Sequence, residues 1–458
     1  METVLKIAQL LKTERSRALL VGGGVRDELL GQSPKDFDLE VYGLAPGELI
    51  SRLSNAGFAL DLVGKAFGVI KIKGAAIDVS LPRRENKLGR GHQGFEIFSD
   101  PSLTPSEAAL RRDFTINAIA KDPLTGELLD FHGGLEDLKN RVLRPTSEKF
   151  MEDPLRVLRA MQFIARFDLR PHPRLIEYSR RMDREGLPRE RICEEFRKLL
   201  VRGVNIKSGL DFLKETAWLR FFPELAAMVG TPQDPVWHPE GDVFEHTGYC
   251  LNEHARQRGG QERDDLVAGL AVLLHDAAKP MTTQCVEGRW RAPGHEAKAR
   301  EPAGRFLRSL TDEEDLIKAV IPLVVNHMMP TQLFRAGAGD AAVRRLALRV
   351  GRLDLLARVV ICDKRGRPPL AAGEIPEVEW LLQTADRLAV TDRKPRPLVL
   401  GRHLLALGLA PGPQVGRILR EIFEAQLDGQ VGTLEEGMAM ARRLTGLRPP
   451  SEGATSGG

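Results

Sequence analysis

Short apolar runs separated by glycine and proline mark the first third of the chain, and they predict β-strands. Four such runs lie at residues 18–21, 38–41, 68–72 and 76–81. Residues 1–11 instead have the apolar spacing of a short amphipathic helix. The polar segment 84–105 carries many charges and several glycines, and we expect it to be a mobile loop.

After about residue 148 the apolar positions recur at helical spacing. The pattern predicts helices over 154–167 and 191–201 and the start of another at 209–213. Amphipathic segments broken by proline and glycine continue from about residue 371, and residues 451–458 are expected to be disordered. The chain therefore predicts an α/β head followed by an all-α body.

Composition narrows this picture only slightly. A chain of 458 residues with 42% apolar and 28% charged residues is typical of a globular protein with two to four domains. A net charge of +4 permits a basic face but does not by itself demonstrate nucleic-acid binding. No apolar run approaches the roughly 20 residues of a membrane span, and no signal peptide opens the chain. The four cysteines, Cys193, Cys250, Cys285 and Cys362, are far apart, so we expect reduced thiols in a cytoplasmic protein. We expect no membrane partner.

The most informative local pattern is a glycine-rich turn followed by two aspartates. Gly22, Gly23 and Gly24 follow an apolar run, which predicts a strand turning into a helix whose first N–H groups can bind phosphate. A dinucleotide-binding G-x-G-x-x-G motif is disfavoured, since Asp27 occupies the third glycine position. Asp36 and Asp38 stand two residues apart, and on a strand both point to one face.

Two further motifs give this turn a context. One is Arg111-Arg112-Asp113-Phe114-Thr115-Ile116-Asn117-Ala118, and the other is Glu152-Asp153-Pro154-Leu155-Arg156. With these motifs, in this order and at this spacing, the chain resembles the class II tRNA nucleotidyltransferases, the bacterial CCA-adding enzymes, over roughly residues 17–200. Bacterial poly(A) polymerases share that head. The resemblance implies a nucleotidyltransferase head of the polymerase-beta-like type.

The resemblance also implies roles for individual residues of the head. Asp36 and Asp38 would be catalytic and hold Mg²⁺ for two-metal nucleotidyl transfer. Asp78 is a possible third ligand on a neighbouring strand, although a solvent-facing aspartate is an equal alternative. The residues expected to bind the nucleotide triphosphate are Gly22, Gly23, Gly24, Arg26, Arg112 and Asn117. For Arg26, an ion pair with Asp27 is the alternative role.

Choosing C or A without a nucleic-acid template requires the protein to imitate a base-pairing edge. Asp153 and Arg156 are three residues apart, with Arg159 one turn further along. On one helix face such residues can accept from and donate to the edge of cytosine or adenine. We therefore expect Asp153, Arg156 and Arg159 to select the nucleotide.

A second constellation lies in the helical body. His246, His275-Asp276 and Asp363 resemble the H…HD…D pattern of HD phosphohydrolases. The resemblance implies a site for a divalent metal ion, for which a transition metal is one candidate. His295 and His327 could join a second metal. Activity on 2′-nucleotides, 2′,3′-cyclic phosphates and simple phosphates is what the resemblance implies, and a role limited to supporting tRNA is the alternative.

These patterns divide the chain into a head, a neck with the nucleotide-selecting helix, an HD-type domain and a C-terminal helical region with a disordered end: 1–145, 146–235, 236–370 and 371–458. The expected function is template-independent addition of CMP and AMP, from CTP and ATP, to the 3′ end of tRNA. A poly(A) polymerase is the first alternative, and it is disfavoured by the HD pattern and the lack of a long basic arm near residues 448–452. An enzyme adding only A stays open beside it, because the head motifs are nearly shared. An RNA-binding HD phosphohydrolase is the second.

Overall fold

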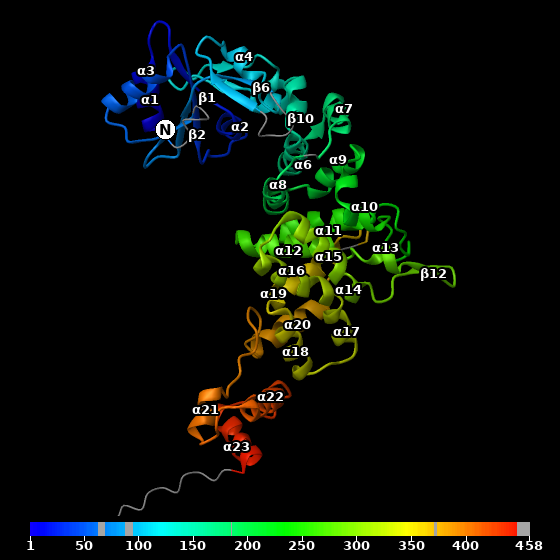
Figure 1. The fold of residues 1–458 in the computed structure, drawn as a ribbon. Helices are drawn as coiled ribbons and strands as arrows, with labels where there is room; N and C mark the ends of the chain where they lie inside the picture. The colour runs from blue at the N-terminus through cyan, green and yellow to red at the C-terminus, as the bar shows by residue number, and fades with distance from the viewer. Residues whose placement is uncertain (63–68, 88–94, 185, 371–372, 447–458) are drawn as a thin grey trace, which may run out of the picture. The chain divides into compact units, whose positions relative to one another are not determined.

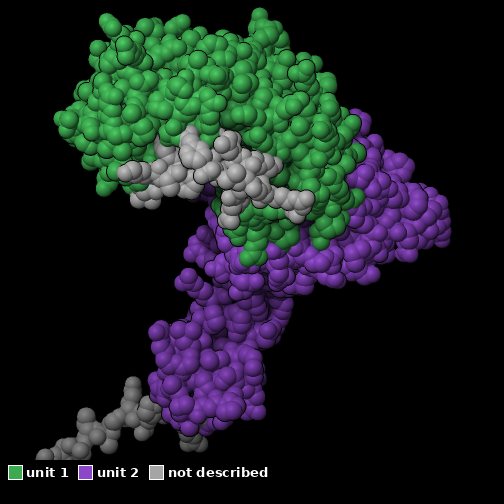
Figure 2. All heavy atoms as spheres, turned by 45° about the horizontal axis from the view of Figure 1, so that its top comes forward, with its two compact units in different colours: residues 1–226, 309–311 green, residues 227–308, 312–458 purple. Residues whose placement is uncertain are grey.

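The chain forms two compact units, which are coloured separately in Figure 2. This computed structural model describes all residues except 63–68, 88–94, 185, 371–372 and 447–458. The first unit contains residues 1–226 and 309–311, and the second contains residues 227–308 and 312–458.

A seven-stranded sheet forms the centre of the first unit, in the order β3-β4-β5-β2-β1-β8-β9. Its strands β1 and β2 are labelled in Figure 1. The strands are β1 (Arg17–Val21), β2 (Phe37–Tyr42), β3 (Leu60–Asp61), β4 (Val69–Ile72), β5 (Ile77–Ser80), β8 (Ala120–Lys121) and β9 (Leu128–Leu129). Strand β2 is antiparallel to β1 and parallel to β5. The four strands predicted from apolar runs are β1, β2, β4 and β5. The three that were not predicted have only two residues each, too short for a pattern to develop.

Two helices cover the core beside these strands. Helix α1 (Glu2–Leu11) matches the amphipathic helix predicted at the start of the chain, and α3 (Pro46–Asn55) follows β2. Ile7 and Leu49 are both fully buried in one cluster with Leu39 and Val79 of the sheet. Burying these apolar side chains is what holds the helices against the strands.

The segment predicted as a mobile loop, 84–105, is in part ordered secondary structure, so that prediction was wrong there. Strand β6 (Arg83–Lys87) pairs with β7 (Phe95–Ser99) in an antiparallel two-stranded sheet, and α4 (Pro105–Ala109) follows. The many charges and glycines of this segment concealed the strand pairing. The middle of the segment, 88–94, lies outside the described residues.

The remainder of the first unit is mainly helical. The helices are α2 (Gly23–Leu29), α5 (Gly134–Lys139), α6 (Leu155–Phe167), α7 (Pro173–Arg181), α8 (Arg189–Arg202), α9 (Ile206–Glu215) and α10 (Pro223–Ala226), with 3₁₀ turns at Thr115–Asn117, Glu148–Glu152 and Trp218–Phe221. Strands β10 (Val142–Leu143) and β11 (Arg170–Pro171) pair in parallel. Gly209 permits the close packing of α9 on α6, because a Cβ there would lie 2.7 Å from the Met161 carbonyl oxygen.

In its described residues the second unit is helical apart from one hairpin, β12 (Gln284–Val286) and β13 (Arg289–Arg291). Its helices are α11 (Val243–Gln257), α12 (Glu262–Leu274), α13 (Lys279–Thr282), α14 (His295–Lys298), α15 (Arg300–Leu310), α16 (Glu314–Asn326), α17 (Met329–Arg335), α18 (Asp340–Val350), α19 (Leu353–Arg365), α20 (Pro376–Arg387), α21 (Gly401–Ala406), α22 (Pro413–Leu427) and α23 (Leu434–Thr445). Every residue of α12 from Asp265 to Leu274 is buried, as expected of a central helix.

The last three helices have a small core of their own, which includes Leu404, Ile422 and Ala441. Within the described part of the chain, no helix has the length and apolar character needed to cross a membrane. The predicted fold class, an α/β head followed by a helical body, is confirmed.

Candidate active site and candidate metal centre

Three aspartates gather where β2 and β5 lie side by side. Asp36 directly precedes β2, Asp38 is its second residue, and Asp78 lies opposite Asp38 in the parallel register. Asp36 and Asp38 are exposed, as a site open to substrate requires. On the next strand, Lys71 Nζ lies 3.5 Å from the Asp78 carboxylate.

The electrostatics of this cluster favour a bound cation. The surrounding protein shields the Asp38 carboxylate from water even though the residue keeps exposed surface. This shielding raises the pKa of Asp38, and the nearby charges of Asp78, Asp36 and Glu40 raise it further against the opposing effect of Arg112. A divalent cation among these carboxylates would offset their repulsion, so the donor set suits a hard oxygen-seeking metal.

The glycine turn lies against these carboxylates. Gly22 has a φ of +76°, and a Cβ there would lie 3.2 Å from Arg112 Nη1 and 3.3 Å from Asp38 Oδ2. A Cβ on Gly24 would lie 3.2 Å from the Asp36 carbonyl oxygen. The glycines therefore let the backbone of the turn approach both the acidic cluster and a cationic side chain.

A buried glutamate that sequence reasoning missed holds the arginines of this site. Glu40 is 1% exposed, and Arg111 donates to it at 2.7 Å while Arg112 lies 3.5 Å away. Tyr42 also donates to Glu40, at 2.6 Å. Burial alone would raise the pKa of Glu40, but Arg112, Arg111 and these hydrogen bonds outweigh it and lower that pKa. The signal was present, because Glu40 continues the two-residue period of Asp36 and Asp38 on the same strand face.

Arg26 and Asn117, both predicted to bind the nucleotide, lie in a buried network behind the glycine turn. Arg26 donates to Asp27 and, at 2.6 Å, to Asn117, which in turn donates to Asp113 at 2.8 Å. Arg159 donates to the other Asp113 oxygen at 2.8 Å. The Arg26 guanidinium also stacks over the rings of Phe163 and Phe167. These contacts link α2 to α6, and the alternative ion pair between Arg26 and Asp27 is present.

Asp153 and Arg156 do not share a helix face, so that part of the prediction was wrong. Helix α6 begins at Leu155, after Pro154 at its N-cap, and Asp153 precedes it in extended conformation. The Asp153 carboxylate accepts from the Leu155 backbone N–H and from Arg191 of α8, each at 3.0 Å.

Arg156 instead donates to the carbonyl oxygens of Lys149, at 2.6 Å, and of Arg111, at 2.8 Å. It thereby connects the start of α6 to the segment that carries Arg112.

In the second unit, four predicted metal ligands converge from three helices. His246 comes from α11, His275 and Asp276 directly follow α12, and Asp363 comes from α19. His246 Nε2 lies 3.2 Å from Asp363 Oδ1 and 3.8 Å from Asp276 Oδ2, and His275 Nε2 lies 3.2 Å from Asp276 Oδ2. All four side chains are buried.

A buried imidazole nitrogen in this cluster fits a cation. His275 Nδ1 lies 2.7 Å from the Val272 carbonyl oxygen, whereas His275 Nε2 is buried and forms no hydrogen bond. Asp276 Oδ2 is 2.7 Å from Lys279 Nζ, with which it forms an ion pair. Burial opposes the ionised form of Asp276, but His275 and Lys279 outweigh it and hold its pKa well below the usual range. Asp363 is likewise held ionised, with Arg367 as the strongest favourable neighbour lowering its pKa. Two buried carboxylates beside bare imidazole nitrogens suit a divalent metal.

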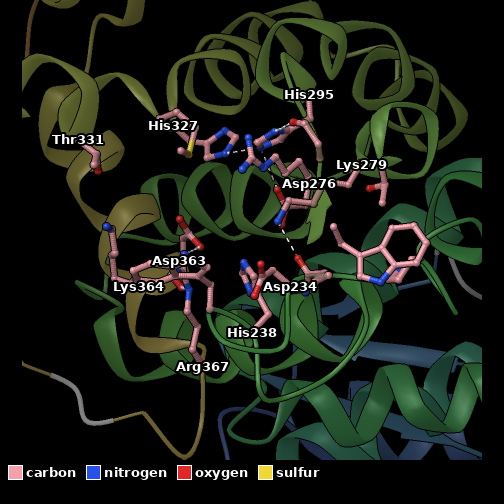
Figure 3. A pocket seen from close by; sticks show the side chains of 18 of the residues that line it. Asp234, His238, Asp276, Lys279, His295, His327, Thr331, Asp363, Lys364 and Arg367 are labelled. Atoms are coloured by element: carbon pink, nitrogen blue, oxygen red, sulfur yellow. Dashed lines mark hydrogen bonds and ion pairs between the residues drawn. The ribbon is translucent and has the colours of Figure 1, made fainter. Parts of the chain in front are cut away.

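His295 and His327 extend the cluster. Their Nε2 atoms lie 3.3 Å apart, and His295 Nε2 lies 3.3 Å from Asp276 Oδ1 (Figure 3). Burial lowers the pKa of His327 to about 3, so its imidazole is neutral and able to bind a metal. Asp276, His295 and His327 form a group of metal-ligand geometry in which Asp276 also belongs to the first cluster.

Comparison with known proteins now identifies the family. The profile of the "Poly A polymerase head domain" matches residues 18–144. The "Multifunctional CCA protein" of Xanthomonas campestris pv. campestris is 34% identical over 416 residues, which cover 87% of this chain and 95% of that protein. The protein of the same name from Stenotrophomonas maltophilia (strain R551-3) is 36% identical over 377 residues, covering 79% and 89%. The chain belongs to the CCA-adding enzyme family.

Solved structures show the same fold at lower identity. The Bacillus stearothermophilus CCA-adding enzyme in complex with CTP has a TM-score of 0.65 at 22% identity, covering 97% of this chain and 98% of that one. The Thermotoga maritima CCA-adding enzyme complexed with tRNA has a TM-score of 0.58 at 22% identity, covering 98% and 96%. Because the relatives above place the chain in the CCA-adding enzyme family, it is a nucleotidyltransferase, and enzymes of this type use divalent metal ions.

A cavity of about 470 Å³ opens beside the histidine–aspartate cluster of this CCA-adding family member. Its wall includes Asp276, His295, His327 and Asp363 together with five cationic side chains and two tryptophans: Lys279, Arg291, Arg335, Lys364, Arg367, Trp237 and Trp290. His238 also lies on this wall (Figure 3), and its Nδ1 is 2.9 Å from Glu240 Oε1. Sequence reasoning missed both residues. Nothing in the local sequence marked these two residues, because they stand in a loop before α11.

Proposed function

We propose that the head adds CMP and AMP from CTP and ATP to the 3′ end of tRNA, without a template, to build or repair CCA. One observation carries this proposal. Asp38 lies opposite Asp78, and Gly22 lies close to both Asp38 and Arg112. Acidic ligands for a metal, a backbone turn for phosphates and a cation are thus within one small site. Processing of tRNA would take place in the cytoplasm.

Asp36, Asp38 and Asp78 would hold Mg²⁺, which when bound stabilises the attacking and leaving oxygens of nucleotidyl transfer. Residues 22–24 offer backbone N–H groups to the triphosphate, and Arg112, held by Glu40, offers a charge. In this proposal Arg26 and Asn117 act on the nucleotide by holding the glycine turn in place.

Base selection is assigned to Asp153, Arg156 and Arg159. Asp153 and Arg156 are now held by Arg191 and by backbone carbonyls, so nucleotide binding would exchange those contacts for the edge of the base. Arg159 is now paired with Asp113, and in this proposal it too would turn to the base.

The test is incorporation of labelled CTP and ATP into tRNA that lacks its 3′ CCA, followed by sequencing of the product. Products ending in CCA support the proposal. Products with long A tails would point to a poly(A) polymerase, and addition to tRNA-CC alone would point to an A-only enzyme. Asp36→Asn should abolish incorporation of both nucleotides, and unchanged CMP addition in that variant would overturn the assignment of the site.

For the body we propose a divalent-metal phosphohydrolase, with 2′-nucleotides, 2′,3′-cyclic phosphates and simple phosphates as substrates. The favouring observation is that cationic side chains line the cavity beside the carboxylate–histidine cluster, as suits a phosphate ester. His246, His275, Asp276 and Asp363 would hold the metal, with a transition metal favoured by the imidazoles; when bound it supplies an activated water. His275→Ala should abolish phosphate release from 2′-AMP, and retained hydrolysis would refute this second activity.

A further inference from the structure

One buried carboxylate contacts two histidines of the body at once. Glu240 Oε1 lies 2.7 Å from His246 Nδ1 and 2.9 Å from His238 Nδ1, and the Glu240 side chain is 0% exposed. The two imidazole rings meet edge to face with centroids 4.7 Å apart. Neither ring can turn without breaking its contact with Glu240.

The shared carboxylate determines where the protons of both rings reside. An ionised carboxylate only accepts hydrogen bonds, so each imidazole must donate its Nδ1–H to Glu240, which leaves Nε2 as the ring atom available to a metal or a ligand. The Gly366 carbonyl oxygen, 3.2 Å from His246 Nδ1, requires the same donor on that ring. His246 Nε2 then faces Asp363 Oδ1 at 3.2 Å and Cys250 Sγ at 3.4 Å, within the cluster of proposed metal ligands.

For His238 the same proton placement has a different consequence. Its ring lies on the cavity wall, and in Figure 3 it is seen across the cavity from His295 and His327. With Nδ1–H directed to Glu240, Nε2 is the ring atom left to accept a hydrogen bond from a ligand. Lys279, Arg367 and the other cations of the wall can only donate. A phosphate ester would satisfy those donors, and a hydroxyl of the same molecule would satisfy His238.

We propose that Glu240 is a positioning residue that fixes His246 as a metal ligand and His238 as the hydrogen-bond acceptor for a hydroxyl of the phosphate ester. This inference rests on the metal-dependent function proposed for the body. No bond is made or broken in this role. Carboxylates behind a ligating histidine fix its tautomer and orientation, and their loss typically weakens metal binding by about 10–100-fold.

The first experiment reads the tautomers directly in the full-length, metal-free chain. With its 10 histidines labelled with ¹⁵N, long-range ¹H–¹⁵N spectra distinguish Nδ1–H from Nε2–H rings, and His238→Gln and His246→Gln assign the two signals. We expect Nδ1–H on both rings. Glu240→Ala should move His238 toward the Nε2–H form, and His246 less, because it keeps the Gly366 carbonyl. An Nε2–H signal for wild-type His238, or no change in Glu240→Ala, overturns the inference.

The second experiment measures Zn²⁺ affinity by calorimetry. Glu240→Ala should bind about 10–100-fold more weakly, whereas Glu240→Gln, whose amide oxygen still accepts, should lose less. Asp265→Ala is the matched control, since Asp265 is another buried acid of the same unit and holds the Gly259 and Gly260 N–H groups and Arg358. It should change the thermal stability but not the affinity.

His238→Ala separates the two roles of Glu240. It should raise the KM for 2′-AMP while leaving kcat less changed. His238, Glu240 and His246 also form a group of metal-ligand geometry, so Zn²⁺ affinity that stays within about twofold in His238→Ala assigns the metal to His246, His275, Asp276 and Asp363, and a larger loss overturns the assignment of His238 as a hydrogen-bond acceptor. Tight Zn²⁺ binding in Glu240→Ala with normal wild-type binding overturns the inference and leaves the metal site standing. Absence of Zn²⁺ binding in the wild type refutes the proposed function, while the tautomer spectra still decide the role of Glu240.

Discussion

Asp38 on β2 lies directly opposite Asp78 on β5, in the parallel register of the head sheet. This pairing brings together two carboxylates that are far apart in the chain. Both lie on the strand face that also carries Glu40, because side chains two residues apart share a face, and Asp36 directly precedes that strand. A site for a hard cation arises from the register alone.

Replacing Asp78 with Asn tests whether this neighbour is a metal ligand. The substitution keeps the shape but removes the charge, so we expect the Mg²⁺ concentration for half-maximal CMP addition to rise at least tenfold, equivalent to about 1.4 kcal/mol. Glu14→Gln, an exposed acid of the same unit, is the control and should leave the Mg²⁺ dependence unchanged. An unchanged dependence in Asp78→Asn would return Asp78 to the solvent-facing role.

Removing the charge of Glu40 should destabilise the head, because it leaves Arg111 and Arg112 without their buried partner. Loss of one member of a buried ion pair costs about 3–5 kcal/mol, and we expect Glu40→Gln near the lower end since both arginines keep some solvent contact. Calorimetric unfolding of the full chain measures this. Glu48→Gln, which breaks a surface pair with Arg52, should cost no more than about 0.5 kcal/mol.

Glu40 also predicts how the stability of the folded chain depends on pH. Its pKa in the folded chain is lowered from the ordinary 4.5, so its stabilising effect is fully present above pH 4.5 and is lost as the pH falls through the lower folded value. Asp113, held ionised by Arg159 against burial, acts in the same direction from 3.8 downward. Glu40→Gln should therefore lose less stability than the wild type between pH 5 and pH 3. Parallel curves for the two proteins would show that Glu40 is not the group responsible.

Much of the head could be predicted because its signals are local. The glycine turn, the Asp36–Asp38 period and the apolar runs all lie within a few residues of one another. The Asp153–Arg156 geometry could not be predicted by helical spacing, because Pro154 starts the helix after Asp153 and Arg191, from a distant helix, takes the carboxylate. Pairings of this kind depend on tertiary packing, which a spacing rule does not contain.

In the body, prediction from the sequence was limited for a different reason. His246, His275, Asp276 and Asp363 belong to a recognisable ordered pattern, and the fold brings them together. Glu240 belongs to no spacing pattern, and its importance arises only from a buried contact with two rings. Residues that orient ligands carry weak sequence signals because their chemistry depends on where the ligands are.

Divalent metal should stabilise the second unit. Binding to the folded state alone contributes RT ln(1 + [L]/Kd), about 2.7 kcal/mol at a hundred times the Kd. To remove the contribution of metal binding at the head, we would compare Asp38→Asn with the Asp38→Asn/His275→Ala double variant. Added Mn²⁺ should raise the Tm of the second unit in the first and have a smaller effect in the second. Equal shifts in both would mean that the stabilising metal binds elsewhere.

The two tryptophans of the cavity predict a preference for substrates that carry a base. Trp237 is 62% and Trp290 39% exposed, and both line the cavity with the phosphate-binding cations. Stacking of a base on an aromatic ring contributes about 1–3 kcal/mol, so Trp290→Ala should raise the KM for 2′-AMP about 5–160-fold. Ribose 2-phosphate, which has the same sugar and phosphate but no base, should lose little, as should the exposed control Met281→Ala. Equal losses for the two substrates would mean that Trp290 shapes the cavity rather than contacting a base.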